Sequence, residues 1–247
     1  MPFSIKEDEN ENNDKFKITK VKYKSDGTDD NVLHPLENGA SFSLFCGKPK
    51  SGKTTLMLSF LTKRAFYLKR FDKVFVFSPS LLSGSLDDDH PLFDLPKDQL
   101  FDNLNVSSLQ NCINKVYGSK KRVLFILDDI QQDLHGECKN LVAKLCFNRR
   151  HLTKKGVSVW ISSQVYNQIP LIIRKNLSSI FLFPTKQAKE IESVREECAD
   201  FLDKEEFGEL LDYVFEKPHD FLYIKCNLQP NEMFHKCFNS LNLTIVK

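Results

Sequence analysis

The stretch Gly47-Lys48-Pro49-Lys50-Ser51-Gly52-Lys53-Thr54 decides the fold, because it is a complete G-x-x-x-x-G-K-[ST] phosphate-binding loop. An apolar run, Phe42 to Cys46, precedes the loop, and the mostly apolar run from Thr55 to Leu61 follows it. The loop therefore lies where such a loop must lie, between a buried strand and an amphipathic helix. This context disfavours the alternative of a glycine turn that fits the pattern by chance. The sequence predicts an α/β fold that binds a nucleoside triphosphate at this loop.

Each residue type in the loop has a chemical reason. Glycines let the backbone curl so that successive N–H groups point at a phosphate, and the helix that follows adds its positive end. Lys53 is expected to contact the β- and γ-phosphates, and the hydroxyl of Thr54 is expected to ligate Mg²⁺. The residues expected to contact ATP are Gly47, Lys48, Pro49, Lys50, Ser51, Gly52, Lys53, Thr54 and Thr55.

A second motif lies at 123–129, where five apolar residues end in Asp128 and Asp129. This pattern predicts a central parallel strand that delivers two carboxylates to the edge of the sheet where ligands of open α/β sheets bind. Asp128 suits a Walker B role, holding Mg²⁺ opposite Thr54, and Asp129 is then placed to polarise the attacking water. Acids after a strand often only open a turn, but the phosphate loop favours the functional interpretation.

A third motif is the apolar run 157–162, which predicts a strand that ends in Ser163-Gln164. The amide of Gln164 would lie beside the catalytic edge, where it could bond the γ-phosphate or the attacking water and so sense hydrolysis. The alternative is a surface glutamine that starts a loop.

The rest of the chain predicts one domain and a tail. At 247 residues with 41% hydrophobic residues, the chain is long enough for one α/β core. Residues 1–36 are polar and predict a mobile tail, with an edge strand over 16–23 as an option. The P-loop domain is expected to span 37–247, with a motif core at 40–184 and an extension at 185–247. Further strands are predicted at 40–46, 73–78, 179–183, 221–225 and 243–246. Helices are predicted from 53 to about 69, from Ser107 or Ser108 to Gly118, at 136–147 and, as one or two helices, over 187–215, with a short helical connection at 169–176. The connection at 81–105 is irregular, and its Asp87-Asp88-Asp89-His90 is interpreted as a solvated loop.

Composition narrows the function classes. The formal net charge of +2 means that any contact with nucleic acid must come from a local basic patch. No apolar run approaches the roughly 20 residues of a membrane span, and no signal segment is visible, so a soluble, unsecreted protein without a membrane partner is expected. The seven cysteines are odd in number and form no C-x-x-C pair, which favours free thiols in a reducing intracellular compartment.

Taken in order, these motifs resemble those of the poxvirus-type DNA-packaging ATPases of large DNA viruses and virophages, a branch of the FtsK/HerA group of P-loop motors. The resemblance covers about 40–184 and is strongest at 45–54, Asn148-Arg149-Arg150-His151, Ile169-Pro170 and Ile173-Arg174-Lys175-Asn176. It implies a RecA-like, mostly parallel sheet, hydrolysis of ATP with Mg²⁺, a homo-oligomeric ring, and pumping of duplex DNA into a preformed capsid. Capsid portal or vertex proteins would be partners, and the host cytoplasm, the nucleus or the virion would be the location.

The resemblance also implies roles for single residues. Lys53 and Thr54 become the Walker A pair, Asp128 and Asp129 the Walker B pair, and Gln164 the polar sensor. Two positions depart from the family's pattern. Lys50 stands where a small residue, often glycine, is usual, and Asp129 stands where many related motors carry glutamate. The shorter carboxylate must approach the water differently, which weakens the assignment of Asp129 as the base.

Three arginines are candidates for a finger that reaches the γ-phosphate of a neighbouring subunit: Arg149, Arg150 and Arg174. A cation there stabilises the charge that spreads in the transition state. For each arginine the alternative is a surface or DNA-phosphate contact. Lys154-Lys155 are a speculative DNA contact, and His151 is interpreted as structural.

Other P-loop classes make different predictions. A GTPase needs an N/T-K-x-D element, and neither the segment 114–117 nor the segment 185–188 supplies its aspartate. A nucleoside or nucleotide kinase remains an alternative, as does a non-catalytic adaptor gated by ATP. The kinase would transfer phosphate to a small acceptor without stimulation by DNA, and the adaptor would bind ATP without turnover.

Overall fold

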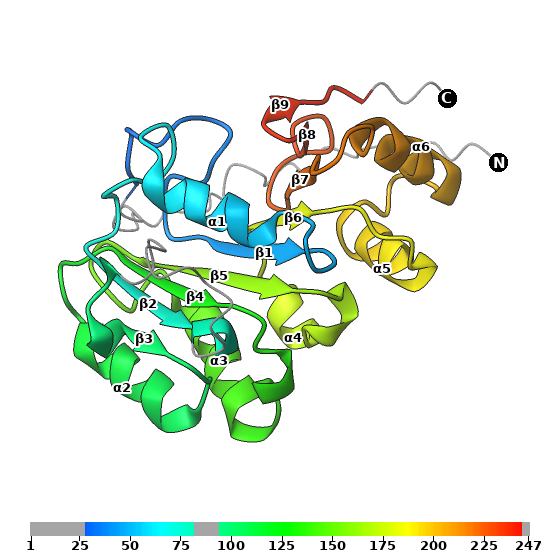
Figure 1. The fold of residues 1–247 in the computed structure, drawn as a ribbon. Coiled ribbons are helices and arrows are strands. Elements are labelled where there is room, and N and C mark those ends of the chain that lie inside the picture. Colours follow the sequence, from blue (N-terminus) through cyan, green and yellow to red (C-terminus); the bar gives the residue numbers. More distant parts are fainter. Residues whose placement is uncertain (1–27, 82–93, 244–247) are drawn as a thin grey trace, which may run out of the picture.

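The computed structural model describes residues 28–81 and 94–243, which fold around a single mixed sheet (Figure 1). Its strands are β1 Phe42–Cys46, β2 Lys73–Phe77, β3 Leu100–Phe101, β4 Val123–Leu127, β5 Val157–Ser163, β6 Ser179–Leu182, β7 Leu222–Lys225, β8 Phe234–Lys236 and β9 Asn239–Ser240. They lie in the order β3-β2-β4-β5-β1-β6-β7-β8-β9. Neighbours from β3 to β6 are parallel, and neighbours from β6 to β9 are antiparallel. The expected mostly parallel α/β sheet is confirmed.

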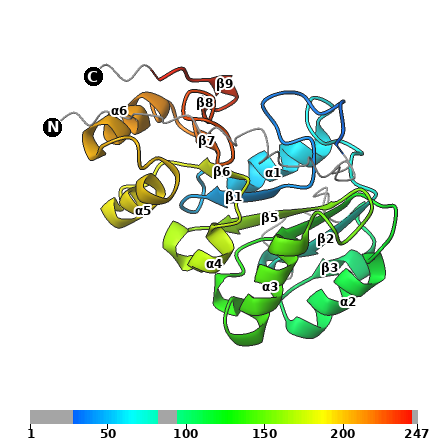
Figure 2. The ribbon, with the colours of Figure 1, turned by 180° about the vertical axis from the view of Figure 1, so that it is seen from behind.

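Helices cover both faces of this sheet (Figures 1 and 2). Their bounds are α1 Lys53–Thr62, α2 Val106–Val116, α3 Gly136–Asn148, α4 Leu171–Arg174, α5 Ala188–Cys198 and α6 Lys204–Val214. The helix α1 packs on one face, while α2, α3 and α4 contribute side chains to the core on the other face. The sequence predicted one or two surface helices over 187–215, and the structure has two, α5 and α6, whose buried residues join the same core as those of α2, α3 and α4.

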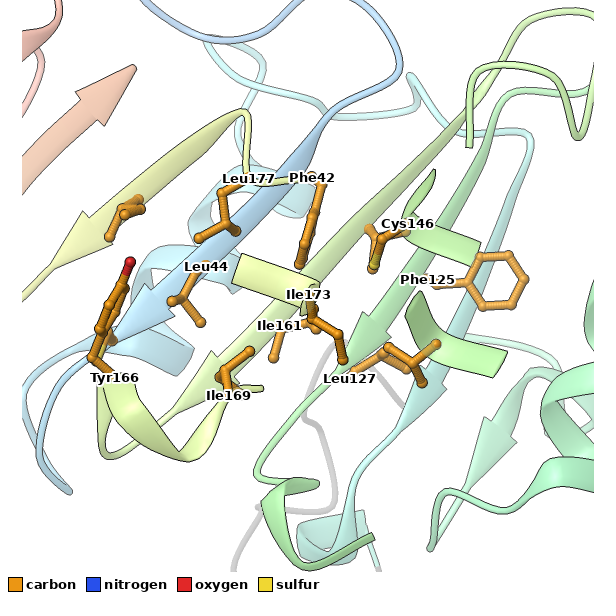
Figure 3. Close-up of a cluster of buried hydrophobic side chains, with 14 of the residues drawn as sticks. Phe42, Leu44, Phe125, Leu127, Cys146, Ile161, Tyr166, Ile169, Ile173 and Leu177 are labelled. Atoms are coloured by element: carbon orange, nitrogen blue, oxygen red, sulfur yellow. The ribbon is translucent and has the colours of Figure 1, made fainter. Parts of the chain in front are cut away.

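Successive side chains of the central strands point to opposite faces of the sheet, and a hydrophobic core lies on each face. In β1, Phe42 and Leu44 join one core, while Phe45 joins the other. Figure 3 shows the first core, where Leu127 of β4 and Ile161 of β5 lie close to Ile173 of α4. Because both faces are buried, these strands read as continuous apolar runs, which is the pattern of parallel strands covered on both sides.

The other core is mainly aromatic and lies under α1. The ring of Phe45 stacks on Phe181 of β6 with 4.7 Å between centroids, and Phe181 stacks on Tyr223 of β7 with a 4.4 Å separation. Trp160 of β5 and Phe60 of α1 meet Phe45 edge to face. Aromatic contacts of this kind add about 0.5–1.5 kcal/mol per pair beyond area burial. These contacts hold α1, the helix that follows the phosphate loop, on the sheet.

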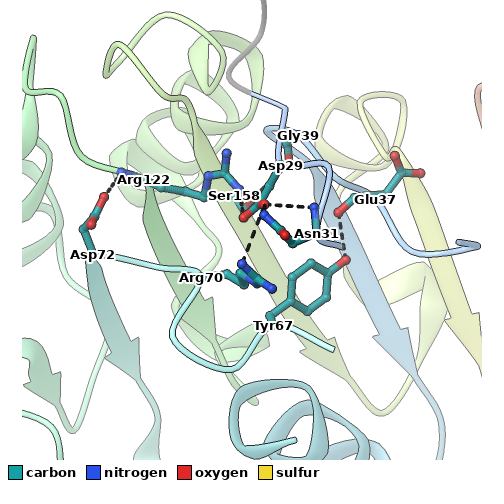
Figure 4. Close-up of polar contacts among 9 residues, drawn as sticks. All are labelled: Asp29, Asn31, Glu37, Gly39, Tyr67, Arg70, Asp72, Arg122 and Ser158. Atoms are coloured by element: carbon teal, nitrogen blue, oxygen red, sulfur yellow. Dashed lines mark hydrogen bonds and ion pairs between the residues drawn. The ribbon is translucent and has the colours of Figure 1, made fainter. Parts of the chain in front are cut away.

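The segment 28–40 belongs to the folded domain, which corrects the predicted tail boundary at residue 36. Val32 and Leu36 are buried. Figure 4 shows how polar contacts hold the segment: Arg122 donates to Asp29 at 2.8 Å, and the Tyr67 hydroxyl donates to the Glu37 carbonyl at 2.9 Å. The sequence missed this because its apolar residues are scattered among polar ones. The predicted mobile segment and edge strand within 1–27 lie outside the described residues.

Two helix boundaries and one hairpin differ from the prediction. Helix α1 ends at Thr62 and not near residue 69, because the Tyr67 N–H bonds the Phe60 carbonyl at 2.8 Å and turns the chain back. Helix α2 is capped by Asn105, whose side chain accepts from the Ser108 N–H at 2.9 Å, so neither Ser107 nor Ser108 is the N-cap. The hairpin of β8 and β9 was not predicted. The interpretation of 87–90 and most of the predicted strand 243–246 lie outside the described residues.

Two further observations bear on the expected class of protein. All seven cysteines are free thiols. Within residues 28–81 and 94–243, no helix has both the length and the apolar character that a membrane crossing requires.

A buried histidine makes the stability of this fold depend on pH. His235 of β8 is 1% exposed and pairs with Tyr223 of β7. Burial lowers the pKa of His235 from 6.5, and the positive charge of Lys225 lowers it further. The unfolded chain, where the ring titrates near about 6.5, therefore binds more protons than the folded chain as the pH falls through that value. Stability from this group is present above that pH and is lost below it.

We expect His235→Phe to remove this dependence. The free energy of unfolding of the wild type should fall, relative to that of the variant, when urea denaturation is repeated from pH 7.5 down to pH 5. His151→Phe, at an exposed position, is the control and should follow the wild type. Parallel pH curves for His235→Phe and the wild type would show that His235 does not carry the effect.

Candidate nucleotide site

The phosphate loop lies at the carboxyl end of β1, where the chain turns into α1. The Gly47 N–H bonds the Ser163 carbonyl of β5 at 3.1 Å, so the loop begins tied to the neighbouring strand. Gly52 has φ 111° and Lys50 has φ 65°. Positive φ favours glycine over residues with a side chain. Lys50 adopts this conformation at a cost of about 1–2 kcal/mol.

Lys53 is folded back onto its own loop. Its side chain is buried, and its Nζ donates to the carbonyls of Gly47 at 2.6 Å and Lys48 at 3.1 Å. Burial lowers the pKa of Lys53, and the nearby charges of Asp129 and Asp128 act in the opposite direction. To bind a triphosphate, the ammonium would exchange these carbonyls for phosphate oxygens. No side chain caps the N-terminus of α1 at Gly52, so its amides remain available to an anion.

The two aspartates follow β4 at the same edge of the sheet. Both oxygens of Asp128 accept hydroxyl hydrogen bonds, one from Ser78 at 3.0 Å and one from Ser162. Burial raises the pKa of Asp128 and the charge of Asp129 adds to this, while the two serines and Lys53 lower it. Asp129 has φ 51°, and its backbone N–H donates to the Ser162 Oγ at 3.2 Å. Ser162 therefore holds both acids in place.

The donor set fits a magnesium ion shared with phosphate. Thr54 offers an exposed hydroxyl in the first turn of α1, and Asp128 offers a carboxylate. Mg²⁺ prefers oxygen ligands and commonly uses one or two carboxylates together with substrate phosphates. Among the described residues no group of three or more His, Cys, Asp or Glu side chains could hold a metal alone. A divalent cation here would depend on the nucleotide for its remaining ligands.

Several residues of this edge were not found from the sequence. Ser78 follows β2 as Asp128 follows β4. Because the carboxyl ends of parallel strands lie at one edge of the sheet, the sequence could have predicted that Ser78 lies near Asp128. Gln131 lies beside Asp129, because its Nε2 is 3.5 Å from the Asp129 Oδ1 and donates to the Ser163 Oγ at 3.1 Å. Gln164, the expected sensor, is exposed at the end of β5. The amide closest to the proposed base is thus that of Gln131.

The three arginines occupy different settings. Arg149 is buried and donates to the Cys146 carbonyl at 2.8 Å and to the Ser178 Oγ at 3.1 Å. Ser178 precedes β6, at the edge opposite to the phosphate loop, and these bonds hold the Arg149 guanidinium within its own subunit. This setting disfavours Arg149 as a finger.

Arg174 is engaged within its own subunit. Its guanidinium bonds both oxygens of Glu197, at 2.5 and 3.0 Å, and lies over the Tyr166 ring at 4.7 Å from the centroid. A bidentate pair of this kind must be broken before Arg174 can act elsewhere. Arg150 is exposed at the end of α3.

A cavity of about 450 Å³ opens beside the loop. Loop residues and the first turns of α1 form one side, and residues from the C-terminal part of the chain form the other. The lining residues include Leu56, Ser59, Phe183, His219 and Phe221, together with the loop from Lys50 to Thr55. The segment beyond residue 184, about which the sequence said little, therefore contributes to the site.

Comparison with solved structures defines the class of fold. The genome-packaging NTPase B204 of Sulfolobus turreted icosahedral virus 2, in complex with ATP-γS, gives a TM-score of 0.53 at 17% identity, over 80% of this chain and 98% of that chain. The DNA-packaging ATPase B204 of Sulfolobus turreted icosahedral virus gives 0.54 at 16%, over 76% and 93%. The conjugation coupling protein TcpA of pCW3 gives 0.53 at 12%, over 81% of this chain and 60% of that chain.

At these identities the similarity establishes a shared fold and nothing beyond the fold. No protein-family model matches the sequence, and no curated protein sequence matches it.

We expect the close approach at Gly47 to be essential for the site. An added Cβ would lie 2.6 Å from the Phe183 Cβ and 2.9 Å from the Ser51 Oγ. Gly47→Ala should lower the free energy of unfolding, measured in urea, by about 1–3 kcal/mol because the site is overpacked. The matched control is Gly208→Ala in α6, where the added Cβ meets nothing within 4 Å. That variant should gain about 0.5–1 kcal/mol, since alanine is the better helix former. A Gly47→Ala protein of unchanged stability would show that the end of β6 can move aside.

Proposed function

We propose that this protein is an ATP-hydrolysing motor that drives duplex DNA into a preformed viral capsid. The observation that carries the proposal is the arrangement at one sheet edge: the phosphate loop after β1 and the aspartate pair after β4, with β5 between them. The fold supports it, because it is shared over nearly the full length of a genome-packaging NTPase. That protein was solved with an ATP analogue, and TcpA, which is also similar, was solved with ATP-γS.

The chain's own residues divide the chemistry between them. The loop amides and Lys53 bind the phosphates, while Thr54 and Asp128 hold the cation. Bound Mg²⁺ supplies positive charge to the phosphate oxygens. Asp129 orients and polarises the attacking water, and Gln131 fixes the Asp129 carboxylate through the bond network that ends at Ser163. The hydrogen bonds from Ser78 and Ser162 keep Asp128 pointed at the cation.

The parts that require more than one subunit are also proposals. A ring would bring a cation to the neighbouring γ-phosphate, and Arg150 is the candidate because it is the exposed member of the three arginines. Gln164, exposed at the end of β5, remains available to a nucleotide or a neighbouring subunit. Lys154 and Lys155 are exposed just before β5, at the edge of the sheet opposite to the phosphate loop, and could contact DNA phosphates. A packaging motor would meet portal or vertex proteins of the capsid in the host cytoplasm or nucleus, or in the virion.

Turnover of ATP by the purified protein, with and without duplex DNA, tests this function. The motor should hydrolyse ATP with Mg²⁺, and DNA should raise the rate in a salt-dependent manner, because phosphate contacts release counterions. A kinase would transfer phosphate to a nucleoside or nucleotide and ignore DNA. An adaptor would bind ATP without turnover. The first of these results would identify a kinase and the second an adaptor, and either would contradict the motor.

Two substitutions separate binding from chemistry. Lys53→Ala should reduce ATP turnover at least about a hundredfold, because it removes the cation that stabilises the transferred charge. Asp129→Asn should keep ATP affinity within a few-fold and lower turnover by about 10²–10⁴-fold, since the amide cannot act as a base. Lys63→Ala and Asp102→Asn, at exposed positions, are the matched controls and should behave as the wild type. Wild-type turnover in Asp129→Asn would place the base elsewhere.

A further inference from the structure

The cavity beside the loop has two chemically different halves. At one end the loop presents the amides of α1 and Lys53, which suit an anion. At the other end the walls are Leu56 and Ser59 of α1, Phe183 after β6, and His219 and Phe221 before β7. Phosphate placed against these apolar walls would lose its hydration without gaining donors, so this half is unsuited to the anionic part of a nucleotide.

His219 joins the C-terminal part of the chain directly to the loop. Its Nδ1 lies 3.0 Å from the Ser51 carbonyl oxygen, and its backbone has φ 68°. A carbonyl oxygen can only accept, so Nδ1 carries the proton and donates this bond. A Cβ added at Gly52 would meet the His219 Nδ1 at 3.5 Å and the Phe183 Cε1 at 3.4 Å. The imidazole and the Phe183 ring therefore stand against the point where the loop becomes a helix.

The geometry points to a nucleobase site in this half of the cavity, where the planar base of the bound nucleotide lies beside His219 and against the wall of Phe183 and Phe221. The inference rests on the proposed function, since it names where the rest of the nucleotide binds once the loop holds its phosphates. The same cavity is lined by the loop and by these rings, so one ligand can reach both.

Size and chemistry agree with this ligand. A cavity of about 450 Å³ is within the usual range for small-molecule sites. Aromatic and apolar walls with a few polar groups suit a flat heterocycle, because a base offers a π-face to aromatic rings and polar atoms at its edge. Binding there would also place the base against residues 219–221, so that the loop and the C-terminal strands contact the same molecule.

The test compares a nucleotide with an anion that has no base. Affinities for Mg²⁺-ATP and for Mg²⁺-tripolyphosphate are measured by calorimetry on the full chain. His219→Ala should weaken ATP about tenfold, an effect typical of losing an aromatic contact with a base, and leave tripolyphosphate within twofold. His151→Ala is the control because His151 is exposed at the end of α3. It should leave both affinities unchanged.

A second variant guards against an effect of His219 on the loop itself. Ser59→Trp is chosen to fill the apolar half from α1, and Ser59 takes no part in the bond between His219 and Ser51. It should weaken ATP at least tenfold and spare tripolyphosphate. Equal losses for both ligands, or none, in His219→Ala and Ser59→Trp would overturn the base site. So would a wild type that binds tripolyphosphate as tightly as ATP. A wild type that binds neither ligand would overturn the proposed function itself, and the base site with it.

Discussion

The pairing of β5 with both β1 and β4 is the constraint on which the site depends. Parallel register sets Cys46 of β1 opposite Ser163, and Leu127 of β4 opposite Ile161, so the three carboxyl ends stop at nearly the same level. The loop that follows β1 and the acids that follow β4 are therefore held one strand apart. Ser162, at the end of that intervening strand, bonds Asp128 and Asp129 directly. A shift of β5 by one residue would point this hydroxyl to the other face.

Burial of charged side chains prepares the sheet edge at the phosphate loop to bind both an anion and a cation. Lys53 and Asp128 are each partly removed from water, and each has its pKa moved by that burial toward the neutral form. The hydrogen bonds from Ser78 and Ser162 and the attraction between opposite charges offset part of this cost. Bound phosphate would supply negative charge beside Lys53, and Mg²⁺ would supply positive charge beside Asp128.

The antiparallel end of the sheet gives the C-terminal part of the chain a place in the site. β7 pairs with β6, which pairs with β1, so residues just before β7 reach the loop from the side away from β5. His219 and Phe221 arrive there, and Phe183 arrives from the end of β6. The loop is thus flanked by Asp128 and Asp129 on one side and by aromatic rings on the other. Glu190 of α5 joins the segment after β5 to the segment after β6, since its carboxylate accepts from the Tyr166 N–H at 2.7 Å and from the Thr185 hydroxyl at 2.6 Å.

The sequence by itself determined the parallel core, the phosphate loop, and the two acids at the edge where ligands bind, because local apolar runs and turn residues specify these features without distant partners. Tertiary structure alone decided that Arg149 is a buried support, that Gln131 lies beside Asp129, and that His219 contacts Ser51. These depend on pairings between residues far apart in the chain, and such pairings leave no periodic signal. The order of strands belongs to the same category, since the apolar run of β5 does not state which neighbours it will have.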